Sequence, residues 1–337
     1  MAKLIKIESN YPNDMLRIEL FLGNSCNYKC WYCVPKFNDG SAPWPKLDTI
    51  LDNLGHLITH YRKTTNKKRV NLYIIGGEPT LWKDFSTFIQ YFKTTHDCII
   101  SISTNGSRTV RWWNDYGHHL DHVMISCHHE RVDINHIVKV ADILYSKNVT
   151  VNAMVLMDPN HWDKCVSYIE QLKYSQHRYL ITALEILGDT IKYSSEQLAY
   201  ISKSIKRYPE LNFYLRNGKT PRNKPMTYYE DGTSKQVNQN YILLNKLNFF
   251  YGWTCNIGVD TFYIDTMGNI RGACGQSLYD MKSMYNIYDK DFKEKFNPTI
   301  RPITCKNLNA CTCHPEANTS KYQTKDLDNG ISAAQVQ

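Results

Sequence analysis

The sequence predicts an α/β fold in which a partial (β/α)6 barrel of the TIM type precedes a small second unit. Two observations support this prediction. From residue 17 to about residue 190, short β-rich runs alternate with longer amphipathic segments, a rhythm typical of βαβ units and a parallel sheet. After Lys206 the rhythm stops, and residues 208–235 hold several Pro, Asn and Gly residues, including the turn signal Asp231-Gly232.

The expected strands and helices follow one another in the order that right-handed crossover connections require. The expected strands are Arg17–Leu22, Val70–Ile75, Cys98–Thr104, His122–Cys127, Val149–Leu156 and Tyr179–Leu187. The expected helices between them are Leu47–Tyr61, Trp82–Phe92, Val110–His118, Ile134–Ser146 and His161–Leu172. Because functional residues of such folds gather at the carboxyl ends of the strands, we expect the site there.

Local sequence patterns predict two further elements, a helix and a hairpin. Ser194 and Gln197 are spaced as a capping box, so we expect a helix to begin there. The stretch 262–270 predicts a hairpin that turns at Met267-Gly268. We therefore expect a barrel at 1–207, a separate unit at 208–316 and a flexible tail at 317–337.

Composition narrows the function classes. No run approaches the roughly 18 uninterrupted apolar residues of a membrane span, and the first residues lack the apolar region of a secretory signal. Eleven cysteines cluster toward both ends, which favours metal binding over disulfides. Metal-bound thiols must stay reduced, so we expect a cytoplasmic protein. The formal net charge of +8 does not identify a partner, and we expect neither a membrane nor a nucleic acid.

Cys26, Cys30 and Cys33 form a C-x3-C-x2-C loop directly after the first expected strand. Three thiolates at this spacing can hold one face of an iron–sulfur cubane. No fourth thiol or imidazole lies nearby in sequence, which leaves one iron for an outside ligand. A structural zinc site or a disulfide loop is the alternative.

The second expected strand runs into Gly76-Gly77-Glu78-Pro79. Glycines at this position let a backbone approach a ligand closely, and Pro79 stiffens the exit. Together, in this order, the cysteine loop and Gly-Gly-Glu-Pro resemble the radical S-adenosylmethionine (radical SAM) superfamily, as does Tyr32 before the third cysteine. The resemblance implies a [4Fe-4S] cluster with an open iron, held by Cys26, Cys30 and Cys33, to which S-adenosylmethionine binds.

The resemblance also implies cofactor-binding residues. Tyr32 lies in the cysteine motif, and the segment Gly76, Gly77, Glu78 and Pro79 matches the part that contacts the methionine group. The remaining implied positions are Ser103, Asn105, Ser126 and Asn152 at the following strands. By strand alternation Ser126, His128 and Glu130 share one face, so His128 is a candidate to reach the substrate; a satisfied histidine at the rim is the alternative.

Five cysteines in the C-terminal unit resemble the twitch or SPASM extensions of radical SAM enzymes, which bind auxiliary [4Fe-4S] clusters. The set expected to bind one such cluster is Cys255, Cys274, Cys311 and Cys313, with Cys305 left over. A structural zinc is the alternative. The C-terminal unit is thus expected to be a small α+β twitch-like domain.

The resemblance implies an enzyme that cleaves S-adenosylmethionine reductively and abstracts a hydrogen atom with the 5′-deoxyadenosyl radical. We expect an oxidoreductase-type reaction, oxidation or rearrangement, on a small polar metabolite such as a sugar or nucleotide derivative. An external electron donor of flavodoxin or ferredoxin type is implied as a partner. A peptide-modifying enzyme is the first alternative. Because the cysteine motif begins at residue 26, we expect no room before it for the leader-binding domain that many peptide-modifying relatives carry. A non-catalytic iron–sulfur or zinc scaffold is the second.

Overall fold

A computed structural model describes residues 2–9, 11–34, 37–173, 180–186, 191–204, 225–237, 242, 245–272, 285–311 and 319–323. The chain divides into two compact units. The first comprises Met1–Leu20, Lys46–Asn71 and Gly218–Gln337, and the second comprises Phe21–Pro45 and Leu72–Asn217. Among the helices of the described residues, none combines the length and apolar composition needed to cross a bilayer.

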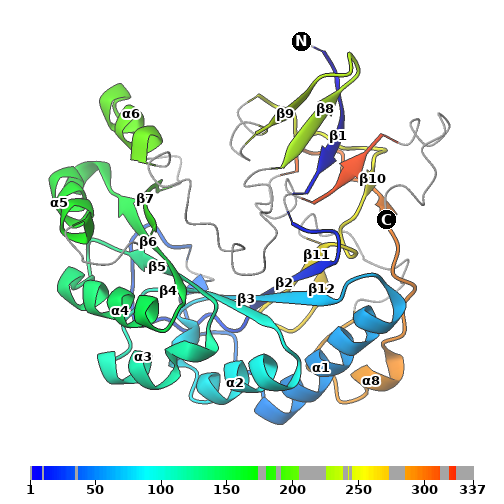
Figure 1. The fold of residues 1–337 in the computed structure, drawn as a ribbon, viewed down its shortest axis with the longest axis horizontal. Helices are drawn as coiled ribbons and strands as arrows, with labels where there is room; N and C mark the ends of the chain where they lie inside the picture. Colours follow the sequence, from blue (N-terminus) through cyan, green and yellow to red (C-terminus); the bar gives the residue numbers. More distant parts are fainter. Residues whose placement is uncertain are drawn as a thin grey trace. The chain divides into compact units, whose positions relative to one another are not determined.

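The second unit is a parallel α/β layer. Its strands lie in the order β3 (Arg69–Ile75, from Leu72 onward), β4 (Ile99–Thr104), β5 (His122–Cys127), β6 (Thr150–Met157) and β7 (Leu180–Glu185). The pairs from β4 to β7 are all parallel. The helices α2 (Phe85–Thr95), α3 (Val110–Tyr116), α4 (Ile134–Ser146) and α5 (Trp162–Lys173) lie along one side of these strands (Figure 1). This arrangement confirms the α/β prediction and fits a partial barrel.

The helices α2, α4 and α5 each bury an apolar stripe. In α4 the buried positions Ile137, Val140, Ala141 and Leu144 recur at helical spacing. Asp133 caps this helix, because its side chain accepts hydrogen bonds from the backbone N–H groups of Asn135 and His136. The predicted bounds of α4 and β5 match the structure residue for residue. The expected ends at Tyr179 and Leu187 lie outside the described residues.

The predicted capping box is present at α6 (Ser195–Ser204). The backbone N–H of Ser194 donates to Gln197 Oε1 at 3.0 Å, and the N–H of Gln197 donates to Ser194 Oγ at 3.2 Å. Each side chain thus satisfies a free amide of the first turn, as the sequence predicted.

The first unit holds an antiparallel sheet in the order β13 (Ile303–Thr304), β10 (Thr254–Cys255), β14 (Lys321–Tyr322), β1 (Leu4–Glu8), β8 (Met226–Tyr229) and β9 (Ser234–Gln236). The sequence did not predict β1, and β14 lies within the expected tail. The expected boundary after residue 207 falls among residues outside the described ranges and stays a prediction.

The predicted hairpin is also present in the first unit. β11 (Thr261–Ile264) and β12 (Ile270–Arg271) pair antiparallel around Gly268, whose φ of 86° only glycine adopts readily. β11 also pairs in parallel with β2 (Met15–Phe21). The unit also contains the helices α1 (Leu47–Thr64) and α8 (Phe292–Lys295), and Asn53 of α1 donates to the carbonyl oxygens of Ile287 and Asp289 at 2.8 Å each.

Candidate active site

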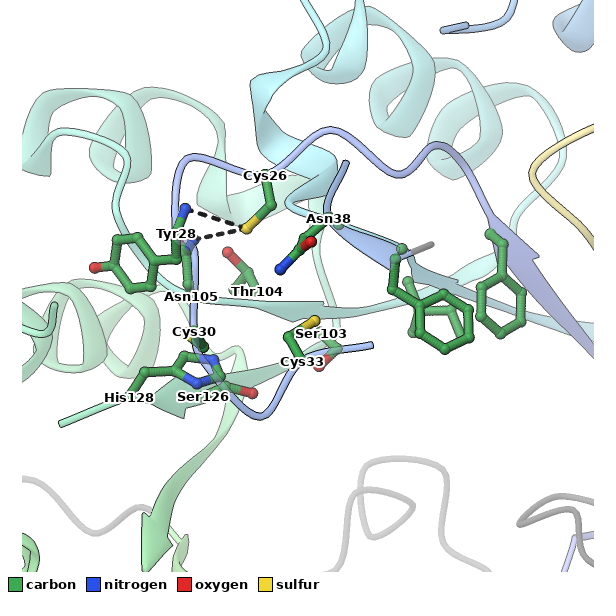
Figure 2. A pocket seen from close by; sticks show the side chains of 15 residues that line it. Cys26, Tyr28, Cys30, Cys33, Asn38, Ser103, Thr104, Asn105, Ser126 and His128 are labelled. Carbon is green, nitrogen blue, oxygen red and sulfur yellow. Dashed lines mark hydrogen bonds between the residues drawn. The ribbon is translucent and has the colours of Figure 1, made fainter. Parts of the chain in front are cut away.

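The three cysteines of the loop after β2 line one cavity of the second unit. Its volume is about 380 Å³. Figure 2 shows Cys26, Cys30 and Cys33 around this space, with the ends of β4 and β5 beside them. The structure therefore brings together the cysteine motif and the strand ends that the sequence assigned to one site.

The two glycines after β3 fit against the start of the cysteine loop. The Gly77 N–H donates to the Gly23 carbonyl at 2.9 Å, and the Glu78 N–H donates to the Ser25 carbonyl at 2.8 Å. A Cβ on Gly76 would lie 2.3 Å from the Gly23 oxygen, and a Cβ on Gly77 would lie 2.3 Å from the Ser25 oxygen. Both residues line the cavity, but the close approach that demands glycine is to backbone.

Glu78 joins the segments after β3 and β4. Its side chain is fully buried, and Oε1 accepts from the Thr80 N–H at 3.1 Å, the Thr80 hydroxyl at 2.5 Å and the Thr104 hydroxyl at 2.8 Å. Oε2 accepts from the Asn105 N–H at 2.6 Å. Burial raises the pKa of this carboxyl, and the hydrogen bonds partly offset the rise. Glu78 thus fixes Asn105, whose amide contacts the Cys26 sulfur at 3.9 Å.

Polar groups at the ends of β4 and β5 face the same cavity. Ser103, Thr104 and Asn105 line it from β4, and Ser126 and His128 line it from β5 (Figure 2). Cys127, between the last two, is fully buried, and its sulfur contacts the Ile125 carbonyl instead. This alternation is the one that the period of a strand predicts.

His128 and Tyr32 form a neutral pair beside the cavity. The Tyr32 hydroxyl and His128 Nδ1 lie 2.7 Å apart, and the two rings stack with centroids 5.9 Å apart. Burial lowers the pKa of His128 to about 4 and raises the pKa of Tyr32. An imidazole without charge at neutral pH donates one hydrogen bond, accepts another and adds no positive charge to the cavity.

Burial raises the pKa of all three loop thiols, to about 12 for Cys30. The Glu130 carboxylate beside Cys30 adds to its rise. The three thiols, one buried and two partly buried, therefore stay protonated until a cation compensates the thiolates, as metal binding does. The backbone N–H of Tyr28 donates a hydrogen bond to the Cys26 sulfur at 3.3 Å.

Four predicted site residues lie apart from the cavity lining. Tyr32 contacts His128, which lines the cavity. Glu78 and Pro79 are buried in the segment after β3. The side chain of Asn152 accepts a hydrogen bond from the Thr182 hydroxyl at 3.0 Å. Their role in cofactor binding stays a prediction. The sequence reasoning did not single out the lining residues Phe21, Tyr28, Phe37, Asn38, Ile75 and Thr104. Tyr28 and Thr104 lie inside or directly beside the recognised motifs, and this position in the sequence could have indicated that they line the cavity.

The C-terminal cysteines lie in the first unit. Cys255 is buried on β10, opposite Ile303 of β13. Cys305 and Cys311 pack against an apolar cluster that includes Phe250 and Trp253. Cys274 and Cys313 lie outside the described residues, so the expected auxiliary set stays a prediction.

Comparison with known proteins identifies the domain around the cavity. The sequence model of the radical SAM superfamily matches residues 20–149, which include the cysteine loop and the ends of β3, β4 and β5. The chain contains a radical SAM domain. Among curated proteins, an S-adenosylmethionine-dependent nucleotide dehydratase of Fibrobacter sp. is 39% identical over 95 residues, or 27% of each chain.

A GTP 3′,8-cyclase of Shewanella denitrificans is 30% identical over 122 residues, or 34% of each chain. The matches thus span about a quarter to a third of the length of these curated relatives. A solved structure, native anSMEcpe with bound AdoMet, has a TM-score of 0.48 and 15% identity, and the alignment covers 85% of this chain and 82% of that one.

The residues of the radical SAM domain fit the groups that its family implies. Cys26, Cys30 and Cys33 are the thiols that would hold a [4Fe-4S] cluster, and they share a cavity with room beside them. Hydroxyl and amide groups of Ser103, Asn105 and Ser126 line that room and suit a polar ligand such as S-adenosylmethionine.

Proposed function

We propose that this protein is a radical SAM enzyme that abstracts a hydrogen atom from a small polar metabolite of nucleotide type, with oxidation or rearrangement as the outcome. The observation that carries the proposal is the convergence of Cys26, Cys30 and Cys33 on one cavity with the polar ends of β4 and β5. When bound, the cluster and S-adenosylmethionine supply an electron and a 5′-deoxyadenosyl radical.

The chain's own residues position and shield the reacting groups. The thiols hold the cluster, and the hydrogen bonds from Gly77 and Glu78 fix the loop that carries them. Phe21 and Phe37 line the cavity with ring centroids 6.2 Å apart and give it an apolar wall. The neutral His128 presents a hydrogen-bonding group to the substrate and adds no positive charge to the cavity.

The relatives support the nucleotide class of substrate. One is named for dehydrating a nucleotide and another for cyclising GTP, and each is similar to about a quarter to a third of this chain. An external donor of flavodoxin or ferredoxin type delivers the electron in this proposal.

A second cluster is the finer part of the proposal. Cys255, Cys274, Cys311 and Cys313 would hold it, which makes the C-terminal unit twitch-like. Iron analysis of the reconstituted protein tests this point, because two cubanes bring about eight iron atoms per chain and one brings about four. A value near four sinks the auxiliary cluster and leaves the radical SAM site intact.

The enzymatic proposal is tested by anaerobic reconstitution with iron and sulfide, followed by S-adenosylmethionine and dithionite. We expect 5′-deoxyadenosine to form, and more of it when a nucleoside triphosphate is added. Cys30→Ala should lower the yield to that of cluster-free protein. Cys98→Ala is the matched control, because this buried thiol directly before β4 does not line the cavity. No 5′-deoxyadenosine above the cluster-free level would refute the proposal, whereas stimulation by peptides alone would replace its substrate class.

A further inference from the structure

Three ligand-type side chains converge outside the cavity, at the ends of two neighbouring strands. His129 follows β5, and Asp158 and His161 follow β6, which pairs in parallel with β5. The nearest atoms are His129 Nε2, Asp158 Oδ2 and His161 Nδ1, and all lie within 4.8 Å of one another. Within the described ranges, no other set of three His, Cys, Asp or Glu residues meets this criterion.

The separations fit a tetrahedral cation. Asp158 Oδ2 lies 3.6 Å from His129 Nε2 and 3.4 Å from His161 Nδ1. Zinc binds nitrogen and oxygen ligands at 2.0–2.2 Å, so the edge of its tetrahedron is about 3.3–3.6 Å. The edge of an octahedron at the same bond lengths is about 2.8–3.1 Å, which is shorter than either separation.

His129 is buried without a hydrogen bond at Nδ1 among the residues that the structure describes. The side chain is 4% exposed, Nδ1 has no hydrogen-bond partner among the described residues, and Nε2 lies beyond hydrogen-bonding distance of the carboxylate. A buried polar group normally has such a partner. A cation bound at Nε2 would give this second nitrogen a ligand, and the carboxylate would balance the charge of the cation.

Asp158 is oriented as ligating carboxylates are. It is 1% exposed, Oδ2 accepts from the Trp31 indole N–H at 3.3 Å, and Oδ1 accepts from the Asn160 N–H at 2.8 Å. Outer-shell hydrogen bonds of this kind fix metal ligands in place. His161, whose side chain is 55% exposed, leaves a path from solvent and room for a fourth ligand.

We propose that His129, Asp158 and His161 bind one divalent cation of zinc type, with water as the fourth ligand. The site is distinct from the cluster thiols, because none of its three residues lines the cavity. Trp31, between Cys30 and Tyr32 in the cysteine loop, connects the two through its bond to Asp158.

The test uses holoenzyme with its iron–sulfur sites filled, freed of loosely bound metal with a chelator and titrated with Zn²⁺. We expect one further zinc per chain by elemental analysis, with only nitrogen and oxygen neighbours in X-ray absorption at the zinc edge. His161→Ala should weaken this binding by at least about 10–100-fold, the range known for the loss of outer-shell partners alone, and should leave the iron content unchanged.

His118→Ala is the matched control. His118 is also an exposed histidine in a 3₁₀ turn, Gly117–His119, and it also packs on a second imidazole, 3.9 Å away between centroids. It has no place in the three-residue set, so zinc binding should persist. The proposal is overturned if the unmodified protein binds no zinc, if sulfur neighbours appear, or if the two variants bind zinc equally well.

Discussion

Glu78→Gln is the change that tests the buried carboxylate most directly. Gln keeps the shape of Glu but replaces one acceptor oxygen with an NH2 donor. If the amide oxygen takes the place of Oε1, which accepts three hydrogen bonds, the NH2 group faces the backbone N–H of Asn105. Two donors then oppose each other where a 2.6 Å hydrogen bond now lies.

The structure sets the size of the effect. The variant loses one hydrogen bond to a charged group, worth about 1.5–3 kcal/mol, and leaves a buried N–H unsatisfied at a further cost of about 1–3 kcal/mol. The neutral amide is easier to bury than the carboxylate, which offsets part of this loss. We expect a net destabilisation of about 2–4 kcal/mol.

The assay is urea unfolding of the apoprotein under reducing conditions, together with hydrogen exchange of the peptide around Asn105. Glu78→Gln should lower the urea midpoint and speed exchange of the Asn105 amide, while Glu294→Gln, an exposed control in α8, changes unfolding by less than about 0.5 kcal/mol. Equal midpoints and equal exchange in the two variants would contradict the role of Glu78 as the link between β3 and β4.

Two further changes probe the loop and the neutral pair. Gly77→Ala drives a methyl group into the backbone of the cysteine loop, so it should reduce iron uptake. Gly232→Ala should not, because its new Cβ meets nothing within 4 Å and its positive φ of 80° strains only its own turn. Equal iron contents in the two variants would argue against the tight fit. Tyr32→Phe removes the hydroxyl that bonds to His128, so it should lower the free energy of unfolding by about 1 kcal/mol while iron uptake is retained. The control is Tyr251→Phe at an exposed tyrosine. Equal free energies of unfolding in the two variants would contradict a stabilising bond.

Local patterns predicted most of the second unit because its elements depend on nearby residues. The bounds of α4 follow from its apolar spacing and from Asp133 just before it, and the capping box of Ser194 and Gln197 acts within one turn. The order of the cysteine and glycine motifs was enough to place both at one cavity, because ends of parallel strands meet at one edge.

What depended on distant contacts could not be predicted in this way. The sequence analysis expected Gly76 and Gly77 to approach a ligand, whereas the closest atoms belong to Gly23 and Ser25, some fifty residues earlier in the chain. Likewise β1 gains its partners from β8 and β14, which lie more than 200 residues away. Neither the glycine contacts nor the pairing of β1 produces a periodic pattern in the local sequence.

The backbone bonds from Gly77 and Glu78 to the cysteine loop also bear on the order of events during protein synthesis. Cys33 leaves the peptidyl-transferase centre 72 residues before Asn105, and synthesis at about 5–20 residues per second makes this interval roughly 4–15 s. During these seconds the three thiols exist without the strand ends that later hold their loop. The hydrogen bonds that hold the cysteine loop can therefore form only after β4 has been synthesised. We expect iron and sulfide to be delivered to the loop after that step.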